Sequence, residues 1–128
     1  EIGGKTVTIG GMSKGFRYDP PEYVHDACIY HNRCRNYKEA LQKALSEDVE
    51  DTYNMISVDG DTSTNDTAIL LANGSGRQVR RITNASPEYD TFKEALHMVN
   101  ETLAKKMAGD GEGATALFEV EVRRRQRV

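Results

Sequence analysis

The chain has 128 residues and a mass of 14.3 kDa, which favours a single domain. Hydrophobic residues make up 38% and charged residues 29%, and no apolar run is long enough to cross a membrane. The net charge of −3 gives no overall field that attracts nucleic acid, and two cysteines are too few for a disulfide framework, so we expect a soluble cytoplasmic protein. Residues 1–5 carry no signal-peptide pattern and suggest a chain entered mid-sequence.

The first part of the chain predicts one strand and one helix. Over residues 5–11, β-branched residues alternate with small or polar ones, which is typical of a short strand. Over residues 37–53, apolar residues recur at every fourth position, which predicts an amphipathic helix.

Three further elements follow. Residues 67–72 form a continuous apolar run, which predicts a buried strand. Ser86 offers an N-cap, with a proline next to it, for a helix that Gly109 ends. The alternation over residues 114–122 predicts a half-buried strand. The order strand–helix–strand–helix–strand therefore predicts a layered α/β (α+β) fold in one partial domain, residues 1–128.

Three arginine-rich segments depart from this pattern, with an abrupt change of composition at their edges: residues 16–36, 75–81 and 123–128. The first of them carries His25, Cys28, His31 and Cys34, all residue types that bind zinc, at every third position. On a helix, residues three positions apart point in progressively different directions, and on a strand they point to alternate faces. The four side chains therefore do not meet at one point in either structure. A small zinc-binding module that uses these four residues, with the arginine tail touching nucleic acid, is nevertheless one alternative function, and stoichiometric zinc would support it.

Two glycine-rich turns offer a charged residue to a ligand. Lys14 lies between glycines but matches neither a Walker nor a dinucleotide motif, and Glu112 lies between glycines after a predicted helix. The loop from Asp59 begins like a calcium-binding loop, but Thr64 stands where glycine is needed and Leu70 where a bidentate glutamate is needed. By residue type alone, the loop from Asp59 and the turn at Glu112 are equally well explained as exposed turns, and Lys14 is better explained as an exposed lysine in a loop.

Four motifs, taken together, resemble one family in their order and spacing. They are VTIGGMSKG (7–15), SVDGDTSTNDT (57–67), LANG (71–74) and DGEGAT (110–115). They resemble the ornithine acetyltransferase family, the bifunctional glutamate N-acetyltransferases of arginine biosynthesis. The DGDTSTND string is the most specific of them, and the resemblance covers most of the chain outside the three odd segments. It implies that the chain is the central piece of a protein roughly three times longer.

The resemblance implies a self-cleaving acyltransferase. In the family a threonine becomes the N-terminus of a β chain, and its hydroxyl attacks the acetyl group of N2-acetylornithine with its own α-amine as base. The acetyl group then passes to glutamate, and acetyl-CoA stays open as a further donor. The resemblance makes Lys14 and Glu112 substrate-binding residues, and such a pair suits the carboxylate and the ammonium of an α-amino acid. It implies no metal, no cofactor, no nucleic-acid or membrane partner, and an oligomer of α/β heterodimers.

The family's nucleophile is missing from the chain as written, because no threonine stands between Lys14 and Asn36. Read one nucleotide later, synonymous codons for residues 16–34 permit SGMIHPNMCTMLAFITTDA, which contains the family's cleavage motif. The lost threonine codon would overlap those of His25 and Asp26. Similar shifts turn the other two odd segments towards family-like sequence. We therefore hypothesise three frameshifted segments and expect an inactive chain; a decayed, non-catalytic relative retained as a packing partner is the milder alternative.

Overall fold

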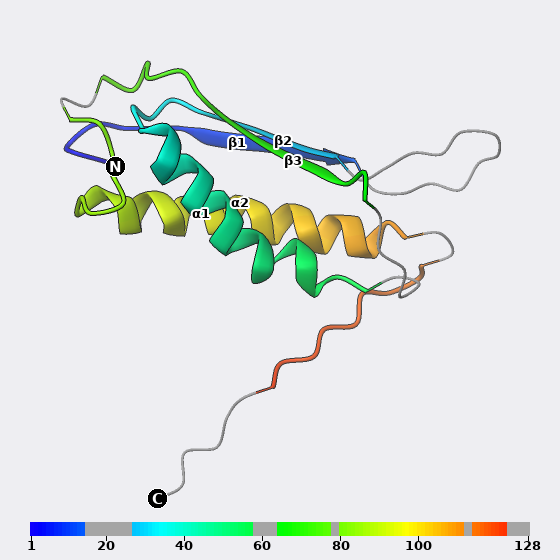
Figure 1. Ribbon diagram of the computed structural model, residues 1–128. Coiled ribbons are helices and arrows are strands. Elements are labelled where there is room, and N and C mark those ends of the chain that lie inside the picture. The colour runs from blue at the N-terminus through cyan, green and yellow to red at the C-terminus, as the bar shows by residue number, and fades with distance from the viewer. Residues whose placement is uncertain (15–26, 58–63, 78–79, 112–113, 123–128) are drawn as a thin grey trace, which may run out of the picture.

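The computed structural model describes residues 1–14, 27–57, 64–77, 80–111 and 114–122. In chain order the elements are β1 (Ile9–Lys14), β2 (Ala27–Asn32), α1 (Lys38–Glu50), the 3₁₀ helix η1 (Tyr53–Met55), β3 (Thr67–Ala72) and α2 (Glu88–Gly109). Figure 1 shows the strands in one layer, with both long helices against the same face of it. The predicted α/β class is therefore confirmed. Within the described ranges, no helix is long and apolar enough to span a membrane.

The three strands form one sheet in the order β1–β2–β3. β1 runs antiparallel to β2, with Gly11 opposite Tyr30, and β3 runs parallel to β2, with Leu70 opposite Tyr30. Because successive side chains of a strand point to opposite faces, Cys28, Tyr30 and Asn32 are buried towards the helices, while the residues between them are exposed. The sheet thus has an inner face against the helices and an outer face that no other described element covers.

Apolar side chains fill the space between the inner face and the helices in two clusters. The larger cluster consists of Ile2, Cys34, Ala40, Ala44, Ile82, Tyr89, Phe92 and Leu96. The smaller cluster contains Cys28, Tyr30 and Leu45, with Leu103 and Met107 of α2 packed against it. Removal of this apolar surface from water is the main force that holds the two layers together.

A buried carboxylate ties the two long helices together. Asp48 of α1 is 9% exposed, and one of its oxygens lies 2.6 Å from Nδ1 of His97 on α2. Its other oxygen accepts a hydrogen bond from the side-chain amide of Asn100, also on α2. A buried carboxylate is tolerated only when such partners satisfy it, so this cluster fixes how α1 lies along α2.

The sequence predicted both long helices correctly, to within a few residues. The helix expected over residues 37–53 is α1 followed by η1, and the helix expected to end at Gly109 is α2. Its N-cap position is Pro87 rather than Ser86, whose hydroxyl instead donates to the carbonyl of Thr83 at 2.9 Å. The serine therefore closes the turn before the helix and does not cap its free amides.

All three strand predictions need correction, and one strand was not predicted. β1 begins at Ile9 and runs to Lys14, later than the expected 5–11. β2 was not predicted and falls within the odd segment 16–36. β3 has the expected bounds but is mostly exposed rather than buried, because it is an edge strand whose outer face none of the described elements covers. Residues 114–122 form no strand, since no described strand pairs with them.

Candidate functional site

Lys14 lies at one end of the sheet, as the last residue of β1. Its Cα is paired with that of Ala27 at the start of β2, which is paired in turn with Thr67 at the start of β3. The side chain is exposed. Alternation from the inward-facing Gly11 puts Lys14 on the outer face of the sheet, on the same side as Met12.

The helix that precedes Glu112 ends at this same end of the sheet. The thiol of Cys28, next to Ala27 on β2, lies 3.8 Å from the sulfur of Met107 in the last turns of α2. The chain then turns, and the amide of Ala114 donates to the carbonyl of Gly111 at 2.9 Å. Glu112 itself lies outside the described residues. The C-terminal end of α2, which leads into the DGEG turn, therefore lies at the end of the sheet that carries Lys14.

The acidic motif leads into the same edge. Its last residues, Asn65 and Asp66, precede Thr67, whose hydroxyl donates to the carbonyl of Asn65 at 3.1 Å. Asp59 and most of the loop after it lie outside the described residues. The described ends of three motifs that are far apart in sequence therefore lie at one end of the sheet, as a shared binding site requires.

The four zinc-type residues do not converge in the same way. Cys28 belongs to the smaller core cluster and Cys34 to the larger one, whereas His31 is exposed on the outer face. His25 lies outside the described residues. The described part of the chain holds no group of three or more His, Cys, Asp or Glu side chains that could hold a metal ion. The zinc alternative thus receives no support from this arrangement.

Burial also keeps the Cys34 thiol protonated, because it raises the pKa of that thiol to about 11. An unfolded chain loses this proton at lower pH, so between about pH 9 and 11 the unfolded state binds fewer protons than the folded one. The contribution of this thiol to stability is therefore complete below about pH 9 and declines as the pH rises towards 11. Urea midpoints across this range should fall, and Cys34→Ala should flatten the fall. A midpoint that rises with pH would contradict this account.

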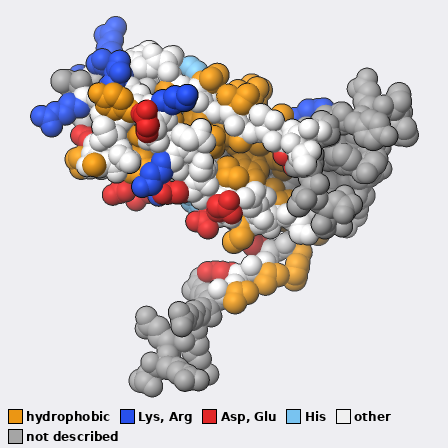
Figure 2. Space-filling model, viewed as in Figure 1, with side chains coloured by type: hydrophobic (Ala, Val, Ile, Leu, Met, Phe, Trp, Pro, Cys, Tyr) orange, Lys and Arg blue, Asp and Glu red, His pale blue; other side chains and the backbone are white. Residues whose placement is uncertain are grey.

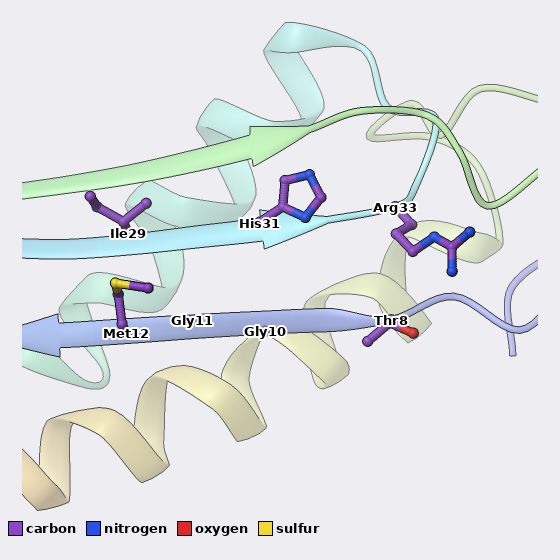
Figure 3. Close-up of a pocket in the computed structure, with 7 residues that line it drawn as sticks. All are labelled: Thr8, Gly10, Gly11, Met12, Ile29, His31 and Arg33. Atoms are coloured by element: carbon purple, nitrogen blue, oxygen red, sulfur yellow. The ribbon is translucent and has the colours of Figure 1, made fainter.

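The outer face carries a shallow depression that the sequence did not predict. Its volume is about 310 Å³, and Figure 3 shows its lining side chains on the side of the sheet away from the helices. The lining residues are Thr8, Gly10, Gly11, Met12, Ile29, His31 and Arg33. It went unnoticed because β2 was not predicted, and without β2 nothing places Ile29 or His31 beside β1. Its mainly apolar walls offer a surface for contact with a ligand, but its lining residues include no acid–base pair for catalysis.

Comparisons with known proteins agree with the motifs. The model of the ArgJ family matches residues 1–127. The chain is 45% identical over 123 residues to the arginine biosynthesis bifunctional protein ArgJ of Lactococcus lactis, covering 96% of this chain and 31% of that protein. It is 44% identical over 121 residues to the protein of the same name from Bacillus subtilis, covering 94% of this chain and 30% of that protein.

A solved structure shows the same relationship. The crystal structure of arginine biosynthesis bifunctional protein ArgJ from Bacillus halodurans superimposes with a TM-score of 0.57 at 40% identity, over 64% of this chain and 38% of that one. The chain spans about three tenths of the length of the curated relatives it matches. Since the family model matches nearly every residue, the chain belongs to the ArgJ family, as its motifs indicated.

Proposed function

We propose that this chain represents part of an acyltransferase that moves an acetyl group from N2-acetylornithine to glutamate in arginine biosynthesis. Membership of the ArgJ family supports the reaction class, and the relatives are named arginine biosynthesis bifunctional proteins. The observation that carries the proposal is the convergence of Lys14, the end of the DGDTSTND motif and the approach to the DGEG turn on one end of the sheet.

Lys14 and Glu112 are the proposed substrate-binding pair. An exposed lysine at a strand end is free to reach a carboxylate, and the carboxylate of Glu112 suits the ammonium of the same amino acid. Opposite charges on the two groups select an α-amino acid over a simple amine or a simple acid. Lys14 is exposed at the end of the sheet where α2 also ends, and this shared end, rather than a shared face, supports the assignment.

In the proposed mechanism an N-terminal threonine supplies the nucleophile. Its hydroxyl attacks the acetyl carbonyl while its own α-amine takes the proton. The amide C–N bond of acetylornithine then breaks, ornithine leaves with that proton on its amine, and the acetyl group stays on the threonine as an ester. The amino group of glutamate then attacks that ester, which regenerates the hydroxyl and yields N-acetylglutamate. The remaining parts of the α and β chains, an oligomer of their heterodimers and a cytoplasmic location belong to the same proposal.

The chain as written should have no activity, because its frame is proposed to be shifted over residues 16–36, 75–81 and 123–128. The absence of threonine between Lys14 and Asn36 supports this, since the nucleophile is expected there. The nucleotide sequence tests it directly. If the alternative frame over residues 16–34 does not spell Cys-Thr-Met-Leu, the frameshift proposal is wrong.

Acetyl transfer from N2-acetylornithine to glutamate tests the function itself. We expect none from the purified chain as written and clear turnover from the full-length, frame-restored protein. In that protein Lys14→Ala should raise KM for acetylornithine by about tenfold or more, because a charge-assisted hydrogen bond to the substrate is lost. Lys5→Ala, a substitution of an exposed lysine far from this edge, is the matched control. Turnover by the chain as written would refute the proposal that it lacks its nucleophile. An inactive frame-restored protein would refute the proposed acetyl transfer and would favour a decayed, non-catalytic relative.

A further inference from the structure

Two segments far apart in the sequence are basic and contain no carboxylate at all. Residues 27–38 and 67–87 include no Asp or Glu. They hold all the arginines in the described part of the chain, namely Arg33, Arg35, Arg77, Arg80 and Arg81. We call these five residues the arginine cluster. The acidic residues behind the net charge of −3 therefore all lie outside these two segments.

The fold places the two segments side by side. The amide of Gly76 donates to the carbonyl of Arg33 at 2.6 Å, and the amide of Ile82 donates to the carbonyl of Arg35 at 2.7 Å. The amide of Tyr37 donates back to the carbonyl of Ile82 at 3.0 Å. These backbone bonds continue the pairing beyond β2, at the end of the sheet opposite to Lys14. Figure 2 shows Lys and Arg side chains gathered at this end of the molecule.

Every arginine of the cluster is exposed, and one exposed aromatic ring lies among them. Tyr37 is 45% exposed, and the guanidinium carbon of Arg81 lies 5.4 Å from the centre of its ring. The side chain of Arg33 is held by Ser75, since its Nε donates to the Ser75 hydroxyl at 2.9 Å. The surface thus combines fixed cations with a flat ring. Proteins that bind single-stranded nucleic acids use these two components, cations for the phosphates and rings for the bases.

We propose that, in the chain as written, the arginine cluster binds the phosphate backbone of a single-stranded nucleic acid, with Tyr37 as a platform for one base. All five arginines lie in segments proposed above to be frame-shifted, so the frame-restored protein would lack this surface. Guanidinium groups bind phosphate oxygens in pairs, and aromatic rings stack on any base. Charges separated by more than about 8–10 Å are largely screened at physiological salt, so the local field depends on the charges nearest the cluster and not on the total charge of the chain. The total charge predicted no such partner because it averages over both ends of the molecule.

Fluorescence anisotropy of the full chain with a labelled single-stranded oligonucleotide tests the electrostatic part. The double variant Arg80→Gln, Arg81→Gln should bind about tenfold more weakly, and the slope of log K against log salt should fall by about 1.4, because about 0.7 is lost per phosphate contact. The exposed Lys106→Gln, on the last turn of α2, should leave both values unchanged. If circular dichroism shows that Arg81→Gln perturbs the fold, Arg80→Gln alone should lower the slope by about 0.7.

The arginine tail needs its own control, because residues 123–127 also carry cations. A variant of the 128-residue chain in which the tail arginines are changed to glutamine should still bind the oligonucleotide. Adding Arg80→Gln and Arg81→Gln to that variant should still weaken its binding. If the tail variant abolishes binding while the double variant binds normally, the tail is the site and the proposal is overturned. Equal weakening by Lys106→Gln would overturn it as well.

Replacement of Tyr37 distinguishes nucleic acid from other polyanions. Tyr37→Leu should weaken oligonucleotide binding by about fivefold or more, since stacking is lost, whereas Tyr37→Phe should retain it. Heparin has no bases, so its binding should be the same for all three proteins. If Tyr37→Leu leaves oligonucleotide binding unchanged, or weakens both ligands equally, the cluster is a general polyanion site and the assignment to nucleic acid is wrong.

Discussion

Phe92→Ala should lower the free energy of unfolding by about 3–5 kcal/mol, because it removes a ring from the centre of the larger core cluster. Phe92 lies on α2 and is 0% exposed. It belongs to the same cluster as Ile82 and Cys34, so it joins α2 to the segments that follow β2 and β3. The loss combines the transfer of the ring to water with the cavity that remains. Urea denaturation followed by circular dichroism measures it.

Phe118→Ala provides the matched control for this prediction. The same side chain is 87% exposed in the segment after α2, so its removal should change stability by less than about 0.5 kcal/mol. If Phe92→Ala unfolds the protein entirely, the conservative Phe92→Leu should fold and show a smaller loss. Equal effects of the two alanine substitutions would contradict the described core.

Gly11→Ala should destabilise the protein by about 1–3 kcal/mol, because β1 and Tyr30 approach each other too closely for any side chain. An added Cβ would lie 2.9 Å from Cε1 of Tyr30, closer still to its Cδ1, and 3.1 Å from Cδ1 of Leu103. The ring cannot retreat easily, since Tyr30 is 0% exposed and its hydroxyl is hydrogen-bonded to that of Tyr53. Thermal unfolding should show the loss as a lower Tm.

Gly10→Ala is the control for the neighbouring position. A Cβ at Gly10 would meet nothing within 4 Å, because it points to the open outer face. We therefore expect a Tm equal to or slightly above that of the parent, since alanine costs less backbone entropy than glycine. A larger loss for Gly10→Ala than for Gly11→Ala would mean that the inner and outer faces of β1 are reversed.

The sequence by itself determined the helices and the family. The apolar spacing of α1 and α2 is a local property of the chain, because residues three or four apart share one helical face wherever the helix lies. The DGDTSTND motif likewise identified the family without any knowledge of its neighbours in space. The bounds of β3 were also local, since an apolar run of strand length ends at a turn.

The burial and pairing of strands required the tertiary structure, because a strand is stable only beside a partner, and that partner can lie anywhere in the chain. β2 lies in a segment of mixed polar composition, yet β1 and β3 pair with it on both sides. Residues 114–122 have a far better strand pattern and remain extended and exposed, because no described edge receives them.

The two surfaces proposed to bind ligands have the same origin. Lys14 and the end of the acidic motif lie at the same end of the sheet only because β1 ends where β2 and β3 begin. The arginine cluster forms because backbone hydrogen bonds join residues 33–37 to 76–82 across the sequence gap. Charge counts and local periodicity contain no information about such pairings, since both are sums over the chain rather than distances between its parts.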